Sequence, residues 1–185
     1  MTLRLQAPAT DTNRLIRQAG RGDPEAQAWL VERWKGPVYR YARRMLQNDQ
    51  DAGDLTQEVL VKVLKSLDAY DPSRNFSTWV FSITRNAAID HYRKHRRHGW
   101  EEPGEVVEPG PSPLQEASRA QEAARLRAAL DQLAPMYREV LVLHHFEFLK
   151  YHEIAEALDL PMGTVMNRIF RARAKLRALY EQEQP

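Results

Sequence analysis

The 185-residue chain contains no cysteine and no long apolar segment. Without thiols it can form neither a disulfide nor a thiolate metal site, which fits a reducing compartment. No apolar run approaches the roughly 20 residues that a helix needs to cross a bilayer. The segment Met1–Thr10 lacks the continuous apolar core of a signal peptide. We therefore expect a cytoplasmic protein with no membrane insertion.

Signatures of common catalytic sites are also missing. The sequence has no phosphate-loop motif and no nucleophile with an evident general base. His144 and His152 could suggest metal ligands, but Glu156 stands one turn after His152, where a zinc protease requires a second histidine. We expect no enzymatic activity, no metal and no cofactor.

No segment alternates convincingly between apolar and polar residues, as an exposed strand would. Apolar residues recur at helical spacing instead, which predicts an all-α fold. Asp23 followed by Pro24 is a typical helix start. Further helices are expected near Thr12–Ala19, after an interruption or restart at Gly36-Pro37, from about Asp51, from Phe76, from about Leu114, from Pro135, over Tyr151–Leu158, and from Thr164.

Gly99–Ser112 holds three prolines, three glycines and few apolar side chains. Such a stretch cannot bury enough surface to fold by itself and is typical of a flexible linker. The sequence therefore predicts two small helical domains, a helical bundle and a helix-turn-helix, joined by this linker. The expected boundaries are an N-terminal extension with a short helix at 1–21, a first domain at 22–98, an acidic, proline-rich linker at 99–119 and a second domain at 120–182.

The net charge is only +2, but the charges are unevenly distributed. Two basic clusters are separated by an acidic stretch, a pattern that indicates two nucleic-acid-binding surfaces on one chain. The first cluster comprises Arg85, Arg93, Lys94, Arg96 and Arg97, and the second comprises Arg168, Arg171, Arg173, Lys175 and Arg177.

The segment 151–170, YHEIAEALDLPMGTVMNRIF, has the spacing of a helix-turn-helix. We expect Thr164 to cap the second helix, and Asp159 to tolerate a left-handed backbone in the turn. Four residues should face the core, Ile154, Leu158, Val165 and Ile169, and four should face outward, Asn167, Arg168, Arg171 and Lys175. An ordinary helical hairpin with a solvated basic face is the alternative, but cap, turn and charge together favour DNA binding.

The segment 75–97, NFSTWVFSITRNAAIDHYRKHRR, mixes aromatic rings with cations. Unpaired bases stack on rings while cations follow the phosphates, so Trp79 and Phe81 beside these cations suit a single-strand site. The preceding loop, Tyr70–Asn75, could hold an extruded base. Any single aromatic can instead fill the core. We expect an inward face of Phe76, Val80, Ile83 and Ala87, and leave Trp79 open between the two roles.

The segment 51–67, DAGDLTQEVLVKVLKSL, predicts a helix with two distinct faces. Asp54, Gln57 and Glu58 are one turn apart and share a polar face, whereas Leu55, Val59 and Val63 should enter the core. By itself, a polar face of this kind is more often simply solvated.

Together these motifs resemble the extracytoplasmic-function (ECF) sigma factors of bacterial RNA polymerase, over nearly the whole chain after Gly22. The segment 51–67 resembles the core-binding motif of region two, 76–94 the promoter-melting and minus-ten segment, and 160–177 the region that reads the minus-thirty-five element. The chain departs from the family pattern at Gly53, where an acid is usual, at Leu60, often a phenylalanine, and at Asn167, commonly a serine.

The resemblance implies a sigma factor that binds core polymerase and directs promoter-specific initiation. Its expected partners are the β′ coiled coil and β flap of core polymerase, promoter DNA and an anti-sigma factor. The implied core-binding residues are Asp54, Gln57 and Glu58. The implied minus-ten residues are Arg74, Asn75, Phe76, Trp79, Arg85, Asn86, Asp90, Arg93, Lys94, Arg96 and Arg97. The implied minus-thirty-five residues are Thr164, Asn167, Arg168, Arg171, Arg173 and Lys175.

A helix-turn-helix regulator that acts without being a polymerase subunit is the alternative function. It would bind its operator as a dimer, without polymerase. The aromatic rings and cations of the first domain argue against it, because a duplex reader does not need exposed rings.

Overall fold

The computed structural model describes residues 9–95 and 113–182, and every regular element in these two ranges is helical. The all-α prediction is therefore confirmed. The first domain contains α1 (Ala9–Gly20), α2 (Pro24–Leu46), α3 (Asp49–Lys65), the short 3-10 helix η1 (Leu67–Ala69) and α4 (Phe76–His95). The second contains α5 (Pro113–Asp131), α6 (Pro135–Leu141), the π-turn η2 (Val142–Phe146), α7 (Tyr151–Leu158) and α8 (Met162–Gln182).

Helix α2 begins as predicted, because the Asp23 side chain accepts a hydrogen bond from the Ala26 N–H at 2.9 Å and Pro24 occupies the first turn. The expected interruption at Gly36-Pro37 is wrong, since the helix runs unbroken to Leu46. A proline inside a helix removes one backbone hydrogen bond. Val38 and Tyr41, both fully buried directly after it, hold the helix against the core and offset that loss.

Aromatic rings build much of the first domain's core. Phe81 is only 2% exposed and packs against Trp34 and Tyr41, with ring centroids 5.9 and 5.7 Å away. Phe76 packs edge-on against Trp34 and Tyr70 at 5.6 and 4.9 Å. These contacts fix α4 across α2, so the outer face of α4 has a defined direction.

The second domain contains the predicted helix-turn-helix, formed by α7 and α8. Asp159 adopts the left-handed conformation in the turn, with φ of 51°, as expected. The four residues predicted to face the core are buried: Ile154, Leu158, Val165 and Ile169. Thr164 is not the N-cap, because α8 already begins at Met162 and the Thr164 N–H donates to the Pro161 carbonyl at 2.9 Å.

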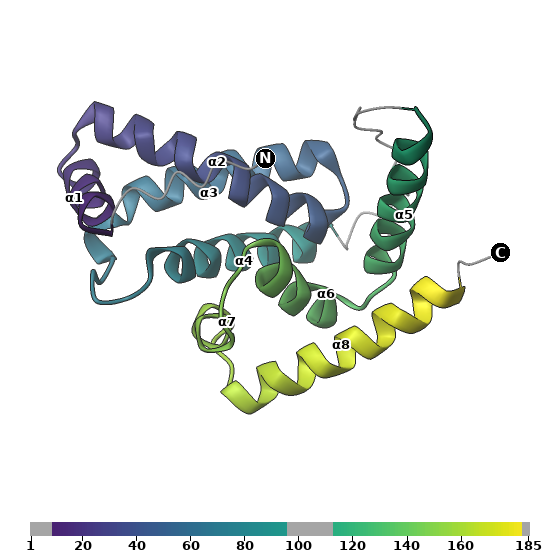
Figure 1. The fold of residues 1–185 in the computed structure, drawn as a ribbon. Helices are drawn as coiled ribbons and strands as arrows, with labels where there is room; N and C mark the ends of the chain where they lie inside the picture. The colour runs from purple at the N-terminus through teal and green to yellow at the C-terminus, as the bar shows by residue number, and fades with distance from the viewer. Residues whose placement is uncertain (1–8, 96–112, 183–185) are drawn as a thin grey trace.

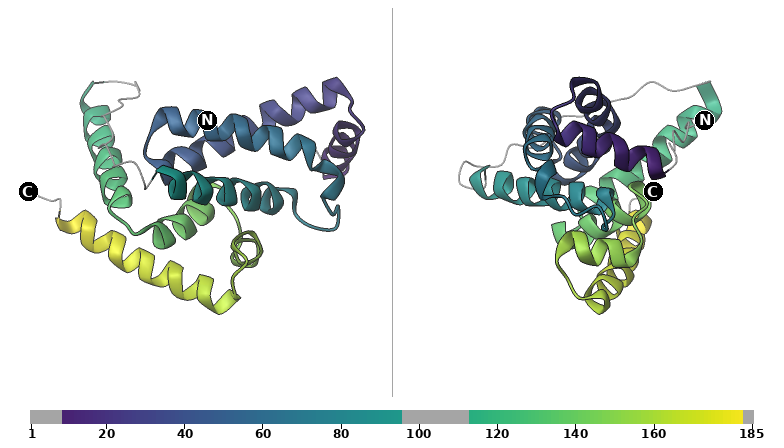
Figure 2. Two further views of the ribbon diagram at one scale, coloured as in Figure 1. Left: turned by 180° about the vertical axis from the view of Figure 1, so that it is seen from behind. Right: turned by 90° about the vertical axis from the view of Figure 1, so that its left-hand side faces the viewer.

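The two domains pack directly on each other, with α7 against α4 and α6 against α2 (Figure 1). The views in Figure 2 show the same arrangement from behind and from the side. Buried apolar residues of both domains form one continuous cluster.

Most of the predicted linker at 99–119 lies outside the described residues, and α5 begins within it, at Pro113. Among the described helices, none has the length and apolar character of a membrane span.

Candidate functional site

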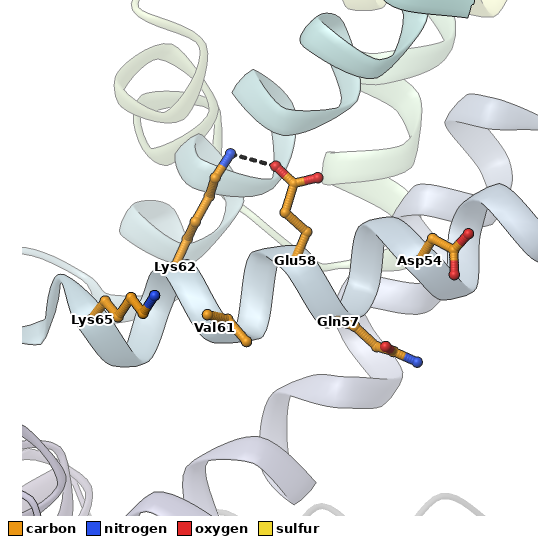
Figure 3. A pocket seen from close by; sticks show the side chains of 6 residues that line it. All are labelled: Asp54, Gln57, Glu58, Val61, Lys62 and Lys65. Atoms are coloured by element: carbon orange, nitrogen blue, oxygen red, sulfur yellow. Dashed lines mark ion pairs between the residues drawn. The ribbon is translucent and has the colours of Figure 1, made fainter.

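Helix α3 presents the predicted polar face to solvent (Figure 3). Asp54, Gln57 and Glu58 are exposed. Leu55 and Val59, on the opposite side of the helix, are at most 1% exposed. The helix is held in this rotation by its buried residues, and its start is fixed by Asn48, whose side chain accepts from the Asp51 N–H at 3.0 Å. The polar side chains therefore project from a rigid base.

The polar face of α3 borders a shallow open groove lined by Asp54, Gln57, Glu58, Val61, Lys62 and Lys65. The Lys62 ammonium lies 2.6 Å from the Glu58 carboxylate, and this hydrogen bond lowers the pKa of Glu58. Val61 is 49% exposed in the middle of the groove and was not among the predicted residues. The sequence could have identified Val61, because it stands four residues after Gln57 and residues i and i+4 share a helix face.

Helix α8 presents its polar residues toward α6. Four predicted duplex-binding residues line one groove with Met136, Tyr137 and Gly163: Thr164, Asn167, Arg168 and Arg171. Lys175 lies 5.6 Å from the centroid of the Tyr137 ring, which orients its charge beside the same groove. Arg173 lies apart, 3.4 Å from the His145 imidazole. The predicted set is thus largely one surface, with Arg173 at its margin.

Exposed apolar side chains on α8 were not predicted. Met166 is 52% exposed and Phe170 is 75% exposed, one turn apart and interleaved with Asn167 and Arg171. Large apolar groups left in water on a helix that also carries cations indicate a surface with a partner. The sequence could have identified both residues. Val165 and Ile169 were expected to face the core, so Met166 and Phe170, which directly follow them, lie on a different face of the helix.

Two family models match the chain, Sigma-70 region 2 over residues 30–98 and Sigma-70, region 4 over residues 123–176. SigW of Bacillus subtilis, an ECF RNA polymerase sigma factor, is 32% identical over 173 residues, which span 88% of this chain and 92% of SigW. The chain belongs to the ECF sigma factors of bacterial RNA polymerase. Region two below denotes residues 30–98 and region four denotes residues 123–176.

Two further relatives cover most of the sigma factor. SigE of Mycolicibacterium smegmatis, also an ECF RNA polymerase sigma factor, is 39% identical over 165 residues, which span 84% of this chain and 63% of SigE. The solved structure of CnrH in complex with the cytosolic domain of CnrY aligns with a TM-score of 0.72 and 31% identity, covering 96% of this chain and all of CnrH. The resemblance inferred from the motifs is thus confirmed.

Of the two rings of the sigma factor's α4 that suited unpaired bases, Phe81 lies in the core and Trp79 is partly accessible. Phe81, assigned with Trp79 to unpaired bases, is buried against Trp34 and Tyr41. Phe76 is only 7% exposed, so its ring faces the core, as its helical phase predicted. Trp79 is half-buried, with its ring 5.3 Å from those of Tyr70 and Phe76. Filling the core of a small bundle took precedence because large rings bury the most apolar area.

The described cations and polar groups of the minus-ten set fall into two groups, one exposed along α4 and one in contact with region four. Asn86, Asp90, Arg93 and Lys94 are exposed along α4, with Arg93 3.8 Å from Asp90. Arg74, Asn75 and Arg85 instead contact carboxylates of region four, as described next. Arg96 and Arg97 lie outside the described residues.

Three contacts join Arg74, Asn75 and Arg85 to region four. The Arg85 Nε lies 3.2 Å from Glu139 Oε1. The Asn75 amide donates to Glu153 Oε1 at 2.6 Å. The Arg74 guanidinium lies 3.4 Å from Glu156 Oε1. Each of these three residues of the predicted minus-ten set therefore contacts an acidic group from α6 or α7.

Glu139 forms the buried centre of this contact. It is 7% exposed, and it accepts a hydrogen bond from the Tyr41 hydroxyl at 3.0 Å. Burial raises the pKa of Glu139, and the neighbouring Arg85 charge and Tyr41 hydrogen bond oppose that rise. Burial raises the pKa of Tyr41 well above its ordinary value, so this hydroxyl remains a donor. Among the residues that the structure describes, no group of three or more His, Asp or Glu side chains is placed to hold a metal ion.

Proposed function

We propose that this sigma factor docks on core RNA polymerase through the polar face of α3. The observation that carries this proposal is the exposed set Asp54, Gln57 and Glu58, which borders a groove containing the exposed Val61. A polar rim around an apolar contact is typical of protein interfaces. The resemblance implies the β′ coiled coil as the partner of this face and the β flap as a second contact.

The groove on α8 is proposed to read the minus-thirty-five duplex. The first turns of such a recognition helix enter the major groove, where the Asn167 amide can pair with adenine in a bidentate way. Arg168, Arg171 and Lys175 would contact phosphates. Met166 and Phe170, exposed on the same turns, would contact thymine methyl groups, the apolar feature of that groove. This assignment gives these six residues of the helix chemically suitable partners.

The outer face of α4 and the loop 70–75 are proposed to hold the melted minus-ten strand. The Tyr70 hydroxyl donates to the Arg74 carbonyl at 2.6 Å, and Asp71 accepts from the Ser73 N–H at 2.9 Å, so the loop is internally braced. Arg93 and Lys94 provide exposed cations for the strand's phosphates. Trp79 supports the loop through Tyr70 and leaves part of its ring accessible.

In this scheme the sigma factor has no enzymatic activity of its own, because the polymerase performs the chemistry. A protein partner that binds the folded chain, the anti-sigma factor implied by the resemblance, is also proposed. It is supported by CnrH, which was solved in complex with the cytosolic domain of CnrY. Such a partner would compete with core polymerase for the sigma factor.

Run-off transcription tests the function directly. The purified sigma factor is combined with core polymerase and a genomic promoter library, and the start sites are sequenced. Transcripts should begin downstream of a shared pair of upstream elements. If no template gives a sigma-dependent start, the proposal is wrong.

Two variants of α8 distinguish a residue that contacts phosphates from a residue that reads bases. Arg171→Ala should weaken binding to all promoters by a similar factor and reduce the salt dependence, since each phosphate contact contributes about one unit of slope. Asn167→Ala should change the preferred upstream sequence instead. Promoter selection from a randomised minus-thirty-five library distinguishes them. Identical sequence preferences for Asn167→Ala and the wild type would exclude base reading by Asn167.

A further inference from the structure

A pocket lies between α1 and the short helix η1, at the end of the first domain that α1 forms (Figure 1). Its volume is about 180 Å³, below the roughly 300–1,000 Å³ that is usual for sites of drug-sized ligands. The pocket therefore has room for one ring system rather than for a large ligand. Its lining residues all lie between positions 13 and 72, so the pocket joins region two to a helix that precedes the residues matched by the region 2 family model.

The inside of the pocket is apolar and preformed. Ile16 of α1 and Leu67 of η1 line it and are only 3% and 6% exposed. Tyr70 lines another side, with its ring packed edge-on against Phe76 at 4.9 Å. The Tyr70 hydroxyl is also fixed, by its hydrogen bond to the Arg74 carbonyl at 2.6 Å. These rigid apolar and aromatic side chains suit a flat ring.

The mouth of the pocket is polar and carries charges of both signs. Asn13, Arg17 and Arg21 are four residues apart along one face of α1, and both arginines are exposed. Asp68 of η1 lies opposite this face, because a Cβ added at Gly20 would be 3.7 Å from the Asp68 Oδ1. Two cations and one carboxylate thus border an apolar pocket.

We propose that this pocket binds a guanine base of the unpaired promoter strand next to the minus-ten bases, and that the Asp68 carboxylate pairs with the Watson–Crick edge of this guanine. Arg17 and Arg21 then provide cations for the adjoining phosphates. Tyr70 and Pro72 belong both to the pocket and to the loop 70–75, so the pocket lies beside the proposed path of the strand. The inference rests on the proposed function of that loop.

The carboxylate at the mouth of the pocket selects among the bases. Guanine presents two neighbouring N–H donors on its Watson–Crick edge, and the two oxygens of a carboxylate can accept both. Adenine and cytosine present an amino group beside an acceptor nitrogen, and thymine presents one N–H between two carbonyl oxygens. Each of these three bases would therefore bring a lone pair towards the Asp68 carboxylate. Hydrogen bonds to a charged group are also stronger than neutral ones, which favours guanine further.

Oligonucleotide binding tests the inference with the full-length chain. A labelled oligothymidylate with one central guanine is compared with the same oligothymidylate without guanine, by fluorescence anisotropy. The guanine should tighten binding about tenfold, within the discrimination expected from one bidentate contact to a base. Inosine lacks the 2-amino group and should lose most of this preference. 7-Deazaguanine keeps the Watson–Crick edge and should retain it.

Variants of the pocket assign the preference to its residues. Asp68→Asn keeps the side-chain size but replaces one acceptor by a donor, and it should reduce the ratio of the two affinities to about one. Gly20→Leu places a side chain in the pocket and should reduce the ratio as well. Glu32→Gln, at an exposed position of α2, makes the same change in net charge as Asp68→Asn and should leave the ratio unchanged.

Equal affinities of the wild type for the two oligonucleotides would overturn the inference. So would a guanine preference that persists in Asp68→Asn, because the base would then be bound elsewhere. Run-off transcription from a library randomised around the minus-ten element gives an independent readout, in which guanine should be enriched at one position for the wild type but not for Asp68→Asn. Sigma-dependent starts without this enrichment would overturn the inference alone, whereas the absence of any sigma-dependent start would overturn the proposed function.

Discussion

Helices α3 and α4 are neighbours in region two, yet they present their polar residues differently. Asp54, Gln57 and Glu58 on α3 face open solvent around a shallow groove. On α4 and the loop before it, Arg74, Asn75 and Arg85 face region four. One proposed binding surface therefore faces solvent alone, and part of the other contacts region four.

The sign of the charge explains this difference. Region four faces region two with Glu139, Glu147, Glu153 and Glu156. The face of α3 balances Asp54 and Glu58 with Lys62 and Lys65, while the cations of α2, α4 and the loop 70–75 attract such a surface. The same cations that suit phosphates also suit carboxylates of the same chain.

The largest expected effect concerns the rings of α4. Phe81→Ala should lower the free energy of unfolding by about 4 kcal/mol, because the ring is buried between Trp34 and Tyr41. Trp79→Ala should cost less, since that ring is half-buried. Urea unfolding followed by circular dichroism measures both. A greater loss for Trp79→Ala than for Phe81→Ala would contradict the assignment of these rings.

The open surface on α3 is probed by Asp54→Ala combined with Gln57→Ala. Affinity for core polymerase should fall about tenfold, while unfolding should change by no more than about 0.5 kcal/mol because both side chains are exposed. Leu55→Ala, on the buried face of α3, is the matched control. It should lower the free energy of unfolding by about 3 kcal/mol and leave the affinity of the folded protein for core polymerase nearly unchanged. Unchanged core affinity in the double variant would refute the role of this face.

Two exposed cations of region two should respond differently in the free chain. Lys94→Ala should weaken single-stranded DNA binding by about twofold to threefold, because this cation is exposed. Arg74→Ala should weaken it less, because the Arg74 guanidinium already lies 3.4 Å from the Glu156 carboxylate. Anisotropy titrations of the two variants measure this difference. A larger loss for Arg74→Ala than for Lys94→Ala would contradict it.

The smallest expected effect is a difference in titration between the two surfaces. Glu58 on α3 should titrate below its ordinary pKa of 4.5, because of the hydrogen bond from Lys62. Glu139 should titrate above its ordinary pKa of 4.5, because burial disfavours the charged form. Carbon-13 NMR of the side-chain carboxyls resolves both. A Glu139 carboxyl that titrates at or below 4.5 would contradict its burial at the interface.

These shifts affect stability in opposite directions. The stabilisation from Glu58 is present above pH 4.5 and is lost as the pH falls through its lower folded pKa. The contribution of Glu139 is greatest below pH 4.5 and is lost as the pH rises through its higher folded pKa. Because Glu58 is exposed at a screened surface pair, its share of this dependence is small.

Features that depend on neighbours along the chain could be predicted from the sequence. The two faces of α3 follow from helical spacing, and the left-handed turn at Asp159 follows from the tolerance of aspartate for that conformation. Features that depend on packing between distant residues could not be predicted from the sequence. The helix through Pro37 persists because the residues after it are buried, and Phe81 is buried because Trp34 and Tyr41 lie across from it.

The sequence by itself determined the all-α class, the order of the two domains and which residues carry polar or basic faces. Periodicity and residue type act over one or two helix turns, so they can be read along the chain. Only the tertiary structure decided that Glu139, Glu153 and Glu156 meet Arg85, Asn75 and Arg74, since these partners are 54 to 82 positions apart in the sequence. Which charge meets which depends on how the two domains pack, and no local pattern encodes that packing.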